Sequence, residues 1–125
     1  MGNATVPDGV WPVMVTPFNK DKSIDFGLYR ELVDFYIDHG VSGLFSCCGS
    51  SEFDKLSRDE MLEITRRTVD SAGGRVPVVG GGIIFDKAQA QSDFIREVHN
   101  LGVTAVIVST NQFTGADESP GEWIE

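Results

Sequence analysis

"VSGLFSCCGSSEFDKLSRDE", residues Val41 to Glu60, contains a strand, a turn and the start of a helix in succession. Its first seven residues are apolar or small and predict a buried strand over Val41–Cys47. The Gly-Ser-Ser-Glu turn that follows presents two hydroxyls and a carboxylate. Ser57 and Glu60 then have the spacing of a capping box, so a helix begins there. Such a turn either holds an anion or simply connects a strand to a helix, and the choice depends on the surrounding segments.

The same strand–helix unit recurs along the chain at a spacing of roughly thirty residues, the size of a βαβ unit. Apolar runs predict strands at Trp11–Thr16, Val41–Cys47, Val76–Val79 and Val103–Thr110. Helical spacing of apolar residues predicts helices from Ser23–Asp25 to Gly40, from Ser57 to Gly73–Gly74 and from Asp86 to Gly102. We therefore expect residues 1–125 to form one domain, with residues 1–10 as an N-terminal extension and residues 114–125 as the start of a fourth helical segment.

Right-handed crossovers make a sheet of this kind parallel. The fold class is therefore α/β, either an open doubly wound sheet or the N-terminal half of a (β/α)8 barrel with about four parallel strands and three or four helices. Both architectures place functional groups at the carboxyl ends of the strands. The segments expected to meet at this edge are the stretch Gly43–Phe53, Gly80–Gly82 and Thr110–Phe113, together with Thr16. The three glycines allow either a phosphate cradle or the close approach of a ligand or neighbouring strand.

Composition limits the partners of the chain. Ten basic and nineteen acidic residues give a net charge of −9, which disfavours nucleic acid and anionic membrane as partners. No apolar run approaches the ~20 residues of a membrane helix, and we expect no signal peptide and a cytoplasmic protein. The two cysteines, Cys47 and Cys48, are adjacent and build neither a disulfide framework nor a zinc site. We expect no cofactor and no metal.

Four segments match one family in order and spacing. They are "VTPF" (Val15–Phe18), "ELVDFYIDHGVSGLF" (Glu31–Phe45), "SSEFDKLSRDE" (Ser50–Glu60) and "GRVPVVGG" (Gly74–Gly81). Together they resemble the dihydrodipicolinate synthase / N-acetylneuraminate lyase family of class I aldolases. The resemblance runs from about Val10 to Phe113 and covers the front half of the family barrel.

The resemblance implies a (β/α)8 barrel in which a lysine forms a Schiff base with a 2-oxo acid, usually pyruvate. The family's Gly-Thr-Thr-Gly-Glu loop, which binds the oxo acid's carboxylate, falls on Cys48–Glu52. Ser50 takes the place of the carboxylate-binding threonine, Gly49 that of the proton-relay threonine, and Ser51 that of the second glycine. The implied substrate-binding residues are Ser50, Ser51, Gly49, Thr16 and Thr110. The alternative is that Ser50 and Ser51 only satisfy backbone groups of the turn.

The reactive groups of the family are missing from this chain. Its lysines are Lys20, Lys22, Lys55 and Lys87, each beside an aspartate and none in a predicted strand. An adjacent carboxylate favours the charged amine, which opposes nucleophilicity. The two tyrosines, Tyr29 and Tyr36, lie on the first helix, and Phe113 stands where the family often has a tyrosine. We therefore expect no catalytic residue here, because the family's lysine belongs to a sixth strand that the chain does not reach.

These observations predict the front half of a C–C lyase that acts on a 2-oxo acid and forms a homo-oligomer when full length. We favour a fragment, because an isolated half barrel leaves its first and fourth strands unpaired. The alternative is a stand-alone half-barrel or flavodoxin-like module that binds a small anion without catalysis. A non-catalytic paralogue that has lost the proton relay is a third reading.

Overall fold

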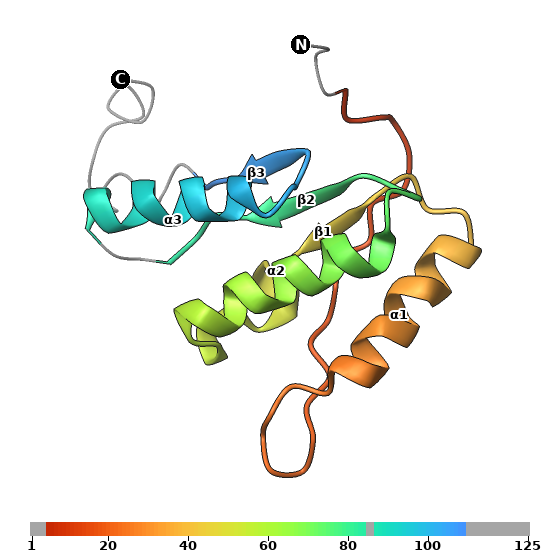
Figure 1. Ribbon diagram of the computed structural model, residues 1–125, viewed down its shortest axis with the longest axis horizontal. Coiled ribbons are helices and arrows are strands. Elements are labelled where there is room, and N and C mark those ends of the chain that lie inside the picture. The colour runs from red at the N-terminus through yellow and green to blue at the C-terminus, as the bar shows by residue number, and fades with distance from the viewer. Residues whose placement is uncertain (1–4, 85–86, 110–125) are drawn as a thin grey trace.

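Parallel strands with helices between them make up the computed structural model, which describes residues 5–84 and 87–109 (Figure 1). The elements in chain order are α1 (Phe26–Asp38), β1 (Leu44–Ser46), the 3-10 turns η1 (Gly49–Ser51) and η2 (Phe53–Lys55), α2 (Arg58–Ala72), β2 (Val78–Gly81), α3 (Ala88–Asn100) and β3 (Ala105–Ile107). Each helix after β1 connects one strand to the next. From α1 onward, the predicted succession of strands and helices is confirmed over the described part of the chain.

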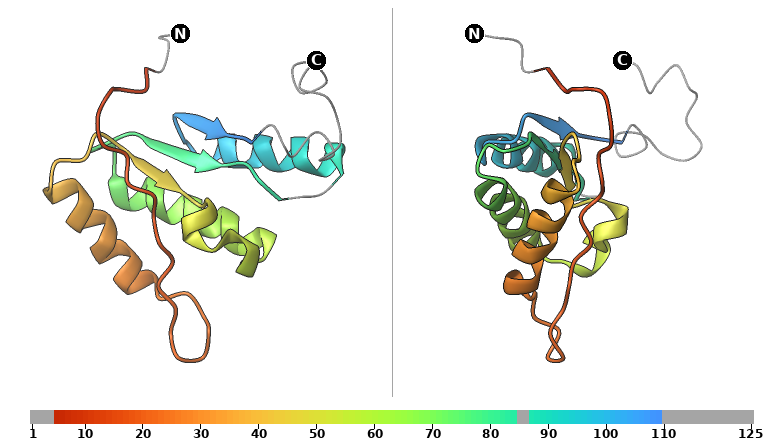
Figure 2. Two further views of the ribbon diagram at one scale, coloured as in Figure 1. Left: turned by 180° about the vertical axis from the view of Figure 1, so that it is seen from behind. Right: turned by 90° about the vertical axis from the view of Figure 1, so that its right-hand side faces the viewer.

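The sheet has the strand order β1-β2-β3, and both pairings are parallel. All three helices lie on one of its faces (Figures 1 and 2). An ideal Cβ on Gly80 would meet Val98 of α3 at 2.7 Å and Thr65 of α2 at 3.3 Å, so both helices cover that face. Sequential strand order with a single layer of helices is the arrangement of a barrel segment, whereas a doubly wound sheet has helices on both faces.

The first predicted strand, Trp11–Thr16, is reduced to a single bridge between Val13 and Phe45. Met14 N donates to Phe45 O at 2.8 Å, and Phe45 N donates to Pro12 O at 3.0 Å. Pro12 has no N–H and cannot donate the next bond of the ladder, so regular pairing does not extend backwards from Val13. The segment nevertheless lies parallel to β1 at the edge of the sheet, where the first barrel strand was expected.

The predicted helix starts are confirmed for the first two helices. Asp25 caps α1, because its Oδ1 accepts a hydrogen bond from Leu28 N at 2.9 Å. Ser57 and Glu60 form the expected capping box at the start of α2, with Ser57 N donating to Glu60 Oε2 at 2.8 Å and Glu60 N to Ser57 Oγ at 3.2 Å. The cap of α3 falls on Lys87, one residue after the predicted Asp86, which lies outside the described residues.

The capping box gives a first stability prediction. Ser57→Ala removes the acceptor of Glu60 N, and we expect the free energy of unfolding to fall by about 1 kcal/mol. Ser50→Ala is the matched control, because the exposed Ser50 hydroxyl has no hydrogen-bond partner among the described residues. Urea denaturation followed by circular dichroism measures both variants. Equal midpoints for the two would contradict a stabilising role for the cap.

The glycine run Gly80–Gly82 lies where strands and helices approach closely. An ideal Cβ on Gly81 would stand 1.8 Å from Cys47 O, and one on Gly82 would stand 2.6 Å from Val106 Cγ1. Close approach of a neighbouring strand, one of the two predicted uses of these glycines, is therefore confirmed. On the helix side the core gathers the fully buried side chains of Met14, Tyr29, Val33, Leu44, Ile64, Phe94 and Val98.

Candidate functional site

The candidate site is the turn that follows β1 at the carboxyl edge of the sheet. The chain leaves β1 through Cys47, which is buried and has a φ of +54°, and it leaves η1 through Glu52, with a φ of +57°. Residues other than glycine seldom adopt this left-handed conformation. Between the two, Ser51 N donates to Cys48 O at 2.9 Å and Glu52 N donates to Gly49 O at 3.0 Å. These bonds close η1 into a compact turn above the end of β1.

Ser51 anchors the turn to the segment beside β1. Its side chain is fully buried, and its hydroxyl donates to Met14 O and accepts from Cys48 N, the latter at 3.1 Å. The buried Thr16 hydroxyl in turn donates to Ser51 O at 2.6 Å. The structure thus brings together Thr16 and Ser51, as expected for one sheet edge, and both hydroxyls are engaged with protein oxygens.

Ser50 and Gly49 lie on the exposed side of the same turn. In the described part of the chain, the backbone N–H groups of Gly49 and Ser50 and the Ser50 hydroxyl have no hydrogen-bond partner. The turn therefore presents three unused donors to solvent, which is the kind of group that binds a carboxylate without a positive charge. Thr110 and Phe113, also predicted at this edge, lie outside the described residues.

Buried hydroxyls on the helix side of the sheet are a feature that sequence reasoning missed. Ser46 Oγ donates to Thr65 Oγ1 at 2.9 Å, and Tyr29 OH lies 2.7 Å from Thr68 Oγ1. The hydroxyls of both threonines donate to backbone carbonyls of α2, so their protons are already hydrogen-bonded within the helix. Burial raises the pKa of the Tyr29 phenol well above its usual range, which keeps it protonated. The only available signal was the pair of threonines three residues apart on the apolar face of α2.

The described lysines are unsuited to Schiff-base chemistry. The Lys55 ammonium pairs with the Asp54 carboxylate at 2.9 Å, and the lysine side chain is 67% exposed. The hydrogen bond that the Lys55 ammonium donates to the Asp54 carboxylate raises the pKa of Lys55, so the amine is protonated at neutral pH. Lys20, Lys22 and Lys87 are exposed and lie outside the strands. The prediction that none of these lysines lies in a strand is confirmed.

Over residues 5–84 and 87–109, no group of three or more histidine, cysteine or acidic side chains is arranged to hold a metal ion. Within the same residues, no helix has the length and apolar character needed to span a bilayer.

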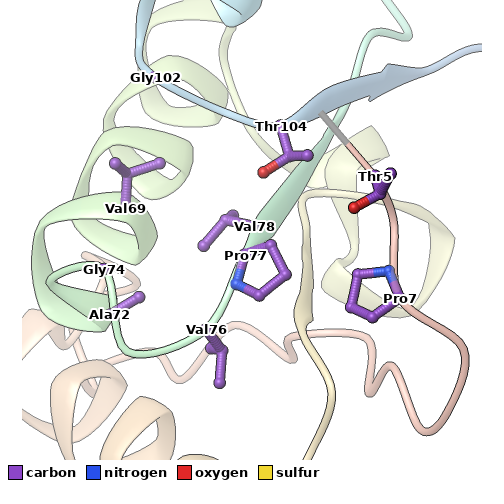
Figure 3. A pocket seen from close by; sticks show the side chains of 10 residues that line it. All are labelled: Thr5, Pro7, Val69, Ala72, Gly74, Val76, Pro77, Val78, Gly102 and Thr104. Atoms are coloured by element: carbon purple, nitrogen blue, oxygen red, sulfur yellow. The ribbon is translucent and has the colours of Figure 1, made fainter. Parts of the chain in front are cut away.

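A pocket of about 480 Å³ lies at the opposite edge of the sheet (Figure 3). Its walls come from the N-terminal residues, the end of α2, the start of β2 and the turn before β3. The lining residues are Thr5, Pro7, Val69, Ala72, Gly74, Val76, Pro77, Val78, Gly102 and Thr104. Among these there is no ionisable side chain to transfer a proton or bind a carboxylate. In a barrel this amino edge serves stability, and the chemistry lies at the carboxyl edge.

The parallel strands, the single helical layer and the hydroxyl-bearing turn at the carboxyl edge define part of an α/β barrel. The chain belongs to the dihydrodipicolinate synthetase family, whose model matches residues 6–108. A curated relative from Koribacter versatilis, named 4-hydroxy-tetrahydrodipicolinate synthase, is 34% identical over 102 residues, which are 82% of this chain and 34% of the relative. A relative of the same name from Acidobacterium capsulatum is 36% identical and covers 81% and 33%. The chain thus spans about a third of the length of these curated relatives.

Solved structures agree with this assignment. The dihydrodipicolinate synthase of Bacillus clausii matches with a TM-score of 0.74 and 35% identity, over 82% of this chain and 34% of that one. YagE, a prophage protein of the dihydrodipicolinic acid synthase family from E. coli K12 solved in complex with pyruvate, matches with a TM-score of 0.74 and 27% identity, over 82% and 37%. The predicted α/β fold and the predicted family are confirmed.

Proposed function

We propose that this chain supplies the carboxylate-binding part of a C–C lyase that acts on a 2-oxo acid such as pyruvate through a Schiff base. Family membership supports the reaction class, and the pyruvate complex of YagE supports the substrate class. The observation that carries the proposal is the set of three unused donors on the turn after β1, at the edge where barrels of this class hold their ligands.

The turn binds the carboxylate with the N–H groups of Gly49 and Ser50 and the hydroxyl of Ser50. Neutral donors that converge in a turn stabilise an anion without a counter-charge, and their exposure leaves room for a small acid. Thr16 and Ser51 belong to the site as the residues that hold this turn. Thr110, which lies outside the described residues, is retained as a proposed substrate-binding residue. Gly49 has no side chain to relay a proton, so proton transfer falls to groups elsewhere in the intact protein.

The nucleophile in this proposal is a lysine outside the 125 residues. Schiff-base formation needs a neutral amine, which requires a desolvated site on a strand inside the barrel. All four lysines here are exposed, and Lys55 pairs with Asp54. Both observations support a nucleophile outside the chain and a carboxylate-binding turn within it. We further propose a homo-oligomeric, cytoplasmic enzyme; the free thiols of Cys47 and Cys48 fit a reducing compartment.

Pyruvate titration of the 15N-labelled chain tests the binding step. We expect saturable shifts of the Gly49 and Ser50 amide signals with pyruvate, and little change with pyruvamide, which lacks the carboxylate. Ser50→Ala should raise the pyruvate Kd by about tenfold, because one charge-assisted hydrogen bond is lost. Equal responses to pyruvate and pyruvamide would contradict carboxylate recognition by this turn.

Borohydride reduction in the presence of pyruvate tests whether the Schiff-base lysine lies outside this chain. We expect no mass increase on the 125-residue chain, because its lysines are exposed and none lies in a strand of the described sheet. A pyruvyl adduct on Lys55 or Lys87, located by peptide mass spectrometry, would overturn the assignment of the nucleophile to a residue outside the chain. The free amino group of the N-terminus is blocked by acetylation as a control for non-specific imine formation.

A further inference from the structure

Ser51 is a fully buried polar residue directly after the exposed Ser50. Its hydroxyl makes two hydrogen bonds that a glycine cannot make, one to Met14 O and one from Cys48 N. A buried hydroxyl is costly unless it is bonded in this way. The bond to Met14 O therefore connects the turn to the segment beside β1.

Thr16 makes the second connection to the same residue. Its side chain is 7% exposed, and its hydroxyl donates to Ser51 O at 2.6 Å. Met14 and Thr16 are two residues apart on one segment, and Ser51 is bonded to the first through its hydroxyl and to the second through its carbonyl. The two attachment points therefore hold Ser51 through its side chain and through the peptide that links it to Glu52.

The donor groups of the turn have no comparable support of their own. The N–H groups of Gly49 and Ser50 and the Ser50 hydroxyl are without partners among the described residues, and an ideal Cβ on Gly49 would meet nothing within 4 Å. A methyl side chain at position 49 would therefore meet no atom of the described residues. The orientation of these donors therefore depends on the anchored residue next to them.

We propose that the Ser51 and Thr16 hydroxyls are positioning groups that hold the Gly49 and Ser50 donors in the orientation that binds a 2-oxo acid's carboxylate. This inference rests on the proposed function, since it explains how the donors of the same turn are oriented before the ligand binds. Donors held in place before binding lose less conformational entropy when the ligand arrives, which increases affinity. A merely structural role would lower stability without affecting the donors.

The test compares Ser51→Ala with Ser46→Ala in the whole chain. Both serines are fully buried and hydrogen-bonded, but the Ser46 hydroxyl bonds to Thr65 on the helix side of the sheet. We expect similar losses of thermal stability for the two variants. Only Ser51→Ala should lower the 15N order parameters of Gly49 and Ser50, from about 0.85 to below about 0.6, and raise the apparent pyruvate Kd by about tenfold.

Thr16 provides a conservative rescue. Thr16→Val keeps the shape and loses the donor, so it should reproduce the Ser51→Ala phenotype, whereas Thr16→Ser should retain wild-type order and affinity. Unchanged order parameters and affinity in Ser51→Ala would overturn the inference. If the wild type fails to bind pyruvate while Ser51→Ala still loosens the turn, the positioning role stands and the proposed substrate is wrong.

Discussion

Gly81→Ala is expected to be the most damaging single-methyl substitution in the sheet, with a loss of about 3 kcal/mol or more of the free energy of unfolding. The added Cβ would lie 1.8 Å from Cys47 O and 3.0 Å from Cys47 C. Both atoms belong to the backbone, so no side-chain rotation relieves the contact. Moving the strands apart would break the β1–β2 pairing, in which Ser46 is opposite Gly80.

Gly49→Ala is the matched control for this substitution. It adds the same methyl group in η1, where an ideal Cβ meets nothing within 4 Å. We expect the free energy of unfolding to change by no more than about 0.5 kcal/mol. Urea denaturation followed by far-ultraviolet circular dichroism compares the two variants with the wild type. A Gly81→Ala midpoint equal to that of Gly49→Ala would show that β1 and β2 separate easily at their carboxyl ends.

Local signals predicted the three helices and the caps of the first two. Asp25 and the Ser57–Glu60 pair act on backbone groups within three residues of themselves, so their effect is encoded in short sequence patterns. The first predicted strand shows that a local apolar pattern does not ensure regular strand pairing. "WPVMVT" is apolar enough for a strand, yet Pro12 lacks the N–H that regular pairing with β1 needs, and only Val13 forms a bridge.

The candidate site was predictable in location but not in the role of each hydroxyl. Parallel topology placed the turn after β1 and Thr16 at one edge, and the structure joins them by a hydrogen bond. Two adjacent serines look alike in sequence. Ser51 is buried and Ser50 exposed because Ser51 bonds to Met14, 37 residues earlier, and a contact at that separation leaves no local trace. The substrate-binding roles of both serines stay predictions.

The buried Cys47 thiol makes the stability of the chain sensitive to alkaline pH. Burial raises its pKa from 9.0 to about 12, with a smaller contribution from Cys48. The folded chain therefore keeps this proton over a range where the unfolded chain releases it. Because the folded pKa is the higher one, the full stability is present below about pH 9 and is lost as the pH rises from 9 toward 12. The raised pKa of Tyr29 acts in the same direction.

At pH 10.5, about 1.5 pH units above the unfolded pKa, the Cys47 effect amounts to a loss of about 2 kcal/mol. Urea midpoints at pH 7.5 and pH 10.5 measure it. Cys47→Ala should lose about 2 kcal/mol less than the wild type between these two pH values, although it starts from a lower stability because a buried side chain is shortened. Cys48→Ala is the matched control and should keep most of the wild-type loss, since it leaves the buried Cys47 thiol, whose pKa is raised mainly by burial, in place. If Cys47→Ala and the wild type lose equal stability over this range, the Cys47 proton does not stabilise the folded chain.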